Sequence, residues 1–433
     1  MLKETSKNIR DNVAFIVTAM CFGLWGAANV MMRPASHTLG RIFDMTEPRT
    51  GDSVIFGNMY AMFLFALVPA ALSVRKYGYK AMVVVGLILF ASGTLTFIPA
   101  SEIGQFKPFV LGYTLMAIGM LTIQITANPF ALTFGSRSMA IFRIMVGQTF
   151  HAVGWLCGFY LVSDPLSQGP SGQEIAGISM LDSIAGSMAQ REALWGIAAP
   201  YLTVGAVAVL LALALGATSF FDRPQDEAPK DSGIRVIVAK LWQDKVFTYG
   251  TLSQAAYVMA QTLCWSGIIS YGTSSLMGQG SDLTRSEASV SAMTFVNMGI
   301  VAYGVIRIIS AAAAAMGKYR PSKVLFVSSV AAAALCAVAI VAGEYPGVLC
   351  MVGVSACMSI MYPTIYYLSM RRQNSSGIQM GSALHIVCVF GGLAAREVVL
   401  FTASEVVHIA ISMVLFFGIA EYAWWCRKNK VGL

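Results

Sequence analysis

Long apolar segments separated by short polar ones run through the whole chain. Each is about 20 residues or longer, the length that a helix needs to cross a bilayer. The pattern therefore predicts twelve membrane-spanning helices and an all-α integral membrane protein. Spans are expected at residues 13–34, 53–74, 81–99, 108–135, 139–162, 196–220, 246–276, 288–316, 322–342, 346–370, 378–401 and 404–426.

A polar segment at residues 221–245 separates the first six spans from the last six. It begins with DRPQDEAPKDSG, a composition typical of a linker, and continues as a short amphipathic piece. We expect a six-helix half at residues 1–220, a cytoplasmic linker at 221–245 and a second six-helix half at 246–433.

Several residues of the first half recur at matching positions in the second half. Two groups of six spans related in this way are the architecture of the major facilitator superfamily, in which the substrate site lies between the halves near mid-membrane. The matched residues are Gly119 and Gly353, Pro129 and Pro363, Arg137 and Arg371, Gly147 and Gly381, His151 and His385, and Gly158 and Gly392.

Composition agrees with a membrane protein. Hydrophobic residues make up 57% of the chain and charged residues 12%, whereas a soluble domain carries about a quarter charged residues. The net charge of +8 does not indicate nucleic-acid binding, because lysines and arginines gather on one side of the predicted spans. This bias predicts that both termini lie in the cytoplasm. The polar start runs directly into the first span, so we expect no cleavable signal peptide.

The eight cysteines show no paired spacing, and most lie inside apolar segments. We therefore expect neither disulfides nor a metal site, and no cofactor.

Polar residues recur on one face of spans four and five. Gln124 and Asn128 lie four residues apart in an apolar stretch that we expect to break at Pro129, and Gln148 and His151 follow in the next span. Lipid cannot satisfy such groups, so they face a watery cavity or a neighbouring helix. The first alternative is typical of a transporter for a polyhydroxylated solute, and the second is simple interhelical bonding.

Five motifs resemble the L-fucose:proton symporter family, whose members also carry glucose and galactose. They are Phe22–Asn29, Ile125–Phe130, Gln148–Phe150, Cys264–Ser266 and Met358–Ile365, and they keep the family's order and spacing along nearly the whole chain. The resemblance implies a secondary transporter that imports a monosaccharide across a bacterial inner membrane by alternating access.

Two acidic positions of that family are occupied by other residues here. Four residues after the asparagine that matches Asn29, the family has an aspartate where this chain has Arg33. In span four the family has a glutamate where this chain has Gln124, and in span five an asparagine where this chain has His151. Because those acids are the family's protonation sites, the resemblance does not carry proton coupling over. Facilitated diffusion, coupling to another ion, and a proton site relocated to His151 or Glu397 remain open.

The expected sugar-binding set joins the cavity-facing polar residues to aromatic residues that stack on sugars. Its members are Asn29, Arg33, Gln124, Asn128, Gln148, His151, Trp265 and Tyr362. Arg33 has a second interpretation, because Pro34 follows it and its side chain would reach the lipid headgroups if span one ended there. The expected partners are a small sugar and the bilayer, with the chain acting as a monomer.

Other functions fit the sequence less well. The chain contains no catalytic motif and no soluble catalytic domain, so we do not expect an enzyme. A sugar receptor would need a signalling domain, and only a few residues follow the last span. An acidic sugar such as a uronate, read by Arg33, is the competing substrate class. The roles of Arg307, Arg396 and Glu397 are left open.

Overall fold

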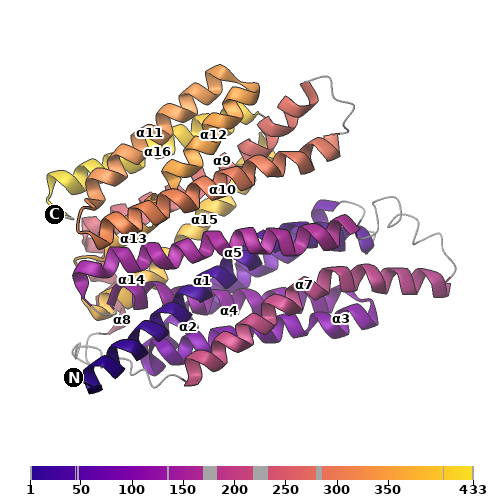
Figure 1. Ribbon diagram of the computed structural model, residues 1–433, viewed down its shortest axis with the longest axis horizontal. Helices are drawn as coiled ribbons and strands as arrows, with labels where there is room; N and C mark the ends of the chain where they lie inside the picture. Colours follow the sequence, from indigo (N-terminus) through magenta and orange to yellow (C-terminus); the bar gives the residue numbers. More distant parts are fainter. Residues whose placement is uncertain are drawn as a thin grey trace. The chain divides into compact units, whose positions relative to one another are not determined.

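The computed structural model describes residues 2–43, 45, 48–133, 136–168, 183–217, 233–278, 285–402 and 404–431, and the regular elements in these ranges are all helices (Figure 1). The chain divides into two compact units. The first comprises Met1–Phe130 and Phe150–Pro224, and the second comprises Ala131–Thr149 and Gln225–Leu433.

The first unit is built from long helices. They are α1 (Leu2–Ile42), α2 (Pro48–Leu95), α3 (Phe97–Ile103), α4 (Phe106–Thr133), most of α5 (Ala140–Gln168) and α7 (Ser183–Ala217). Helix α2 holds two predicted spans, because Gly78 interrupts it with a φ of 84° that other residues rarely adopt. The aromatic rings of Phe97, Phe109, Tyr113 and Tyr201 interlock at edge-on angles in its core.

Two prolines lie inside helices that the sequence led us to end or break there. Helix α1 continues through Pro34 to Ile42, so the expected end of span one at residue 34 is wrong. Helix α4 continues through Pro129 to Thr133, so the expected break is also wrong. A proline leaves one helical carbonyl without its donor, but neighbouring helices make this tolerable inside a membrane bundle.

Glycines bring α1 and α5 into backbone contact in the first unit. Added side chains at Gly26 and Gly154 would collide with the carbonyl oxygens of His151 and Gly23, respectively. A Cβ on Gly158 would lie 2.6 Å from the Cα of Ala27. Small residues at such a seam are typical of membrane helices, where close van der Waals packing replaces the hydrophobic effect. We call these contacts the α1–α5 seam.

The second unit contains the remaining helices. They are α8 (Ile234–Gln243), α9 (Lys245–Gly278), α10 (Arg285–Ala315), α11 (Pro321–Ala342), α12 (Glu344–Met358), α13 (Met361–Met370), α14 (Ser375–His385), α15 (Val389–Phe401) and α16 (Glu405–Lys428). Predicted span ten is thus two helices, α12 and α13. Span eleven is also two, because the 3₁₀ turn η2 (Ile386–Cys388) separates α14 from α15.

Arg143 links the end of α4 to the residues that precede α5. The 3₁₀ turn η1 (Arg137–Met139) precedes α5, and the Arg143 side chain donates to the carbonyls of Ala131 at 2.9 Å and Ser136 at 3.0 Å. The last carbonyls of a helix lack intrahelical donors, so a buried cation satisfies them in this turn.

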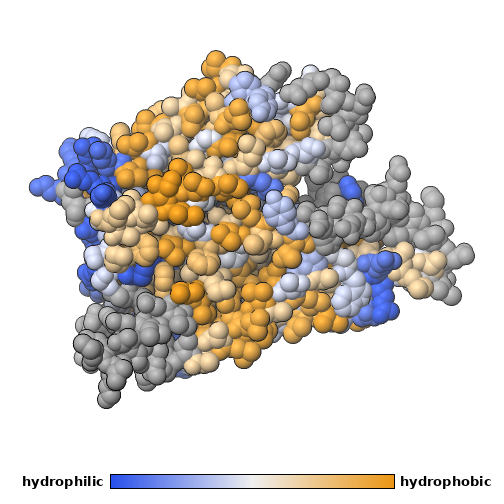
Figure 2. Space-filling model, in the orientation of Figure 1, coloured by the Kyte–Doolittle hydropathy of each residue, from blue (hydrophilic) through white to orange (hydrophobic). Residues whose placement is uncertain are grey.

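Large apolar side chains cover the outside of both units. Val341 is 88% exposed, Phe401 84% and Phe65 76%, and Figure 2 shows apolar residues along the helix flanks with polar residues gathered toward the helix ends. Such surfaces need lipid around them. Nine segments of the described residues are long and apolar enough to cross a membrane.

The sequence-based count of twelve spans fits these nine segments. One of them, Val54–Ile103, contains two spans because Gly78 divides it. Helices α5 and α9, with 29 and 34 residues, are also long enough but carry more polar residues.

Candidate functional site

Helix α1 carries a polar stripe beside the α1–α5 seam. Trp25, Asn29 and Arg33 follow one another at four-residue steps and so share one face of α1. The Trp25 ring meets the ring of His151 edge-on, with 4.6 Å between centroids. Asn29 is exposed, and the Arg33 side chain lies outside the described part of the structure. His151, half-buried, therefore belongs to the same local surface as the α1 stripe.

Helix α4 contributes two buried amides to the first unit. Gln124 and Asn128 are 6% and 4% exposed and lie on one face of α4. The Oδ1 atom of Asn128 has no hydrogen-bond partner among the described residues. A buried acceptor without a donor destabilises the fold by about 1–3 kcal/mol. This oxygen is therefore suited to accept a hydrogen bond from a hydroxyl of a bound molecule.

Arg307 lies at the centre of a polar cluster in the second unit. Its side chain is fully buried and donates to the Tyr303 hydroxyl at 2.7 Å and the Gln148 backbone carbonyl at 3.2 Å. It also donates to the Ser359 carbonyl. The guanidinium carbon lies 4.3 Å from the centre of the Tyr303 ring, a cation–π arrangement. We call these residues, with Tyr257, the Arg307 cluster.

The bond from Arg307 to Ser359 has a specific cause. In a continuous helix, the carbonyl of Ser359 would accept from the backbone nitrogen of residue 363, but that residue is Pro363 and has no N–H. Ser359 therefore lies in the break between α12 and α13, and its hydroxyl donates to the Tyr303 carbonyl at 2.5 Å. Arg307 supplies the donor that Pro363 removes.

Three residues expected to bind sugar meet around the Arg307 cluster. Gln148 joins it through its carbonyl, the half-buried Trp265 packs with its ring centre 6.1 Å from that of Tyr303, and the half-buried Tyr362 lies 6.0 Å from Tyr257 by the same measure. The hydroxyls of Tyr257 and Tyr303 are 3.3 Å apart. Aromatic faces and hydrogen-bonding groups thus converge from α5, α9, α10 and α13.

Two buried donors of this arrangement are unused. Gln148 Nε2 and Arg307 Nε have no hydrogen-bond partner in the part of the chain that is described. Both side chains are less than 5% exposed. Neighbouring donors without acceptors, next to aromatic faces, can hold a neutral molecule rich in hydroxyl oxygens.

Sequence reasoning missed several members of the cluster. Tyr257 and Tyr303 read as ordinary aromatic residues of apolar spans, and Arg307 was left without a role. Gln254 was also missed: it is fully buried on α9, and neither end of its amide has a partner among the described residues. A glutamine in an otherwise apolar segment was the only available signal.

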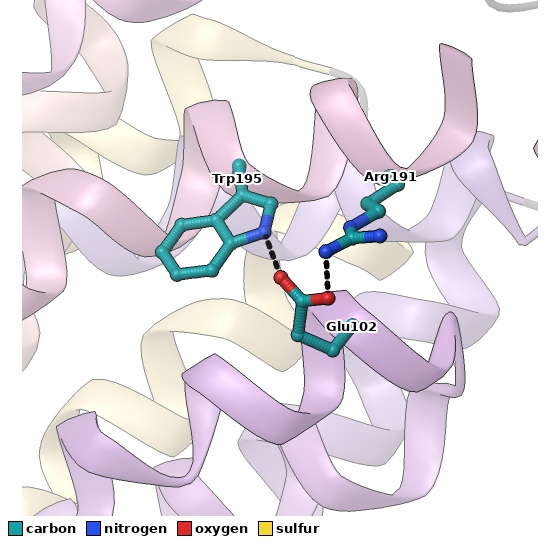
Figure 3. Close-up of polar contacts among 3 residues, drawn as sticks. All are labelled: Glu102, Arg191 and Trp195. Atoms are coloured by element: carbon teal, nitrogen blue, oxygen red, sulfur yellow. Dashed lines mark hydrogen bonds and ion pairs between the residues drawn. The ribbon is translucent and has the colours of Figure 1, made fainter. Parts of the chain in front are cut away.

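Two charged pairs link residues outside these clusters. Glu102 pairs with Arg191 and accepts from Trp195 Nε1 at 2.9 Å, which ties α3 to α7 (Figure 3). Arg396 and Glu397, neighbours in α15, pair with each other at 3.6 Å. All four charged side chains are at least one-third exposed, so these pairs contribute little to stability.

Metal chemistry finds no support in the described ranges. They hold no group of three or more His, Cys, Asp or Glu side chains able to bind a metal ion. All eight cysteines are free thiols.

Comparisons with known proteins identify related sequences and folds. No family model matches the chain. It is 25% identical to the L-fucose-proton symporter of Escherichia coli strain K12, covering 94% of this chain and 90% of that protein. It is 22% identical to a glucose/galactose transporter of Brucella abortus, covering 99% and 97%. The resemblance to the L-fucose:proton symporter family is thereby confirmed.

A solved structure decides the fold. FucP, a major facilitator superfamily transporter solved in the outward conformation, matches with a TM-score of 0.83 at 24% identity, over 96% of this chain and 99% of that one. The chain has the major facilitator fold. The nine candidate spans of the described residues agree with a chain of this fold that crosses the membrane several times.

Proposed function

We propose that this protein carries a monosaccharide across the membrane by alternating access. The observation that carries the proposal is the pair of unused donors, Gln148 Nε2 and Arg307 Nε, buried beside aromatic rings in an apolar bundle. Sugar hydroxyls are suitable acceptors for them, and a sugar's apolar face suits Trp265 and Tyr362. The names of the relatives, which are fucose, glucose and galactose transporters, support the same conclusion. Transporters are not enzymes, in agreement with the expectation from sequence.

We propose that the sugar is bound by the residues expected from the sequence, which are Asn29, Arg33, Gln124, Asn128, Gln148, His151, Trp265 and Tyr362. The amides and the imidazole would exchange hydrogen bonds with hydroxyls, while the indole and phenol rings would stack on the sugar.

The proposed arrangement of the chain in the membrane is the one predicted from the sequence. We propose that residues 1–220 and 246–433 are the two halves that alternate, joined by 221–245, with both termini in the cytoplasm of a bacterium and the chain in its inner membrane. One copy supplies every residue of the proposed site, so we expect the monomer to be active.

Counterflow in proteoliposomes tests the proposal directly. Purified protein in vesicles preloaded with unlabelled sugar should accumulate labelled L-fucose, D-glucose or D-galactose transiently, whereas empty vesicles should not. Gln148→Ala should lose this signal, and Gln243→Ala, at an exposed position on α8, should keep it. Failure of all neutral sugars, with uptake of glucuronate or galacturonate instead, would replace the neutral substrate by an acidic one.

A further inference from the structure

His385 occupies an unusual place in the second unit. It is the last residue of α14 and is 3% exposed. The rings of Phe247 and Tyr366 each lie 5.6 Å from it, measured between centroids. Neither ring nitrogen of His385 has a hydrogen-bond partner in the described part of the chain. A buried imidazole with both nitrogens unused is therefore held between two aromatic rings.

The described residues around His385 provide no hydrogen-bond partner for either ring nitrogen. A neutral imidazole has one N–H donor and one acceptor, and each costs about 1–3 kcal/mol when buried without a partner. The Tyr366 hydroxyl is already bonded to Ser382 Oγ at 2.5 Å. A conformation that exposed the ring to water would give both nitrogens partners.

The helices near the ring present mainly apolar side chains among the described residues. Helix α8 turns Ile237 and Leu241 inward, α9 contributes Phe247, and α13 contributes Tyr366 and Met370, which together form one apolar core. Tyr366 is the titratable group that faces the ring. Five charged residues of these helices and their ends are exposed, and they are Arg235, Lys240, Lys245, Arg371 and Arg372. Asp244, between α8 and α9, is half-buried and accepts from Gln373 Nε2 at 2.6 Å. Arg143 is buried beside the same core and donates to the carbonyl of Ala131.

The backbone changes course directly after His385. The 3₁₀ turn η2 (Ile386–Cys388) interrupts predicted span eleven between α14 and α15. Short 3₁₀ stretches within a longer helix often mark a hinge, and broken helices in transporters are places where a group changes its environment. Bending at η2 would move the His385 ring relative to α15.

The other histidines with described side chains differ from His385. His408 shares its Nε2 with the hydroxyl and carbonyl of Thr402 at 2.8 and 2.9 Å, so it has fixed partners. His151 is half-buried against Trp25 in the continuous helix α5. Among the histidines whose side chains are described, only His385 combines burial, two nitrogens without a partner and an adjoining helix break.

We propose that His385 is the group that takes up and releases a proton during the transport cycle. The proposal rests on the proposed sugar transport and adds coupling to it. A proton from water on one side binds the free lone pair of the imidazole, and the same N–H bond breaks on the other side, so no further reactant is needed. An imidazole exposed to water changes its charge near neutral pH, whereas burial favours its neutral form, so a proton would bind only in a conformation that exposes the ring. Arginine at position 33 and glutamine at 124 cannot perform it.

The experiment measures sugar movement and proton movement separately. Counterflow of the best sugar from the preceding test reports transport without requiring a proton gradient, and external alkalinisation on sugar addition reports coupling. We expect wild-type protein to show both. His385→Gln and His385→Asn should keep counterflow and reduce sugar-dependent alkalinisation at least tenfold. His408→Gln, the matched control, should keep both.

Several outcomes would overturn the proposal. Alkalinisation that persists in a His385 variant with intact counterflow would exclude His385, and its loss in His151→Gln alone would move the proton site to α5. Wild-type counterflow without any alkalinisation would show that transport is not coupled to protons and would end the proposal, whether or not the variants fold. Absence of wild-type counterflow for every sugar would instead refute the proposed function.

Discussion

Removing the Arg307 side chain should destabilise the second unit because one buried carbonyl would lose its only replacement donor. In Arg307→Gln, the Gln148 carbonyl keeps its place within α5 and Tyr303 keeps its contact with Tyr257. The Ser359 carbonyl has no such alternative, since Pro363 has no N–H. An orphaned buried carbonyl costs about 1–3 kcal/mol. When the loss of the bonds to Tyr303 and to the Gln148 carbonyl is included, we expect the free energy of unfolding to fall by about 2–3 kcal/mol.

Thermal unfolding in detergent can detect this loss. For a chain of this length, about 2–3 kcal/mol corresponds to a fall in Tm of roughly 2–3 °C, on the per-residue entropy of unfolding. Arg396→Gln is the matched control, because that arginine is partly exposed and pairs only weakly with Glu397. Its Tm should stay within about 0.5 °C of wild type, since exposed pairs are worth about 0–1 kcal/mol.

A double-mutant cycle tests the cause. Pro363→Ala restores an N–H at the position from which a helix would serve the Ser359 carbonyl. The double variant Arg307→Gln/Pro363→Ala should therefore be more stable than the sum of the single changes predicts, with a coupling of about 1–2 kcal/mol. Strictly additive effects, or an Arg307→Gln variant as stable as wild type, would refute the reasoning.

Three further predictions follow from the fold and the candidate site. Gln148→Ala should weaken sugar binding about tenfold, the equivalent of about 1.4 kcal/mol, and unchanged affinity in calorimetry would remove Gln148 from the site. Gly154→Val should prevent assembly of the α1–α5 seam, because a Cβ at this position would collide with the Gly23 carbonyl oxygen. The variant should lose the monodisperse peak in fluorescence-detected size-exclusion chromatography. Gly418→Val, where a Cβ would meet open space, should elute as wild type does. Glu102→Gln should leave counterflow unchanged and lower Tm slightly at low salt but not at high salt, and loss of counterflow would contradict the structural role of that pair.

The fold could be predicted from the sequence because the thickness of the bilayer fixes the length of the helices that cross it. Helices that cross it need about 20 apolar residues, so the apolar segments predicted the spans with small errors. The errors at Pro34 and Pro129 share one cause. Proline rules learned from soluble helices assume that water competes for the freed carbonyl, whereas inside a membrane bundle neighbouring groups must satisfy it and the helix continues.

The candidate site was only partly accessible. Gln148, Trp265 and Tyr362 stood out as polar or aromatic residues in motifs, and the structure brings these three together. The role of Arg307 was hidden, because it depends on a carbonyl in another helix that lost its donor to a proline four residues later. The unused nitrogens of His385 were equally hidden, since a sequence names the imidazole but not what surrounds it.

The α1–α5 seam limits how this transporter can change its substrate. A Cβ on Gly26, Gly154 or Gly158 would lie less than 3 Å from backbone atoms of the facing helix, and a Cβ on Gly23 would lie 3.2 Å from the Phe150 carbonyl oxygen. New specificity must arise at positions that face away from the seam, among them Asn29. A library built for a new sugar should vary such positions and leave the four glycines untouched, because evolution can alter the chemistry along these helices but not the distance between them.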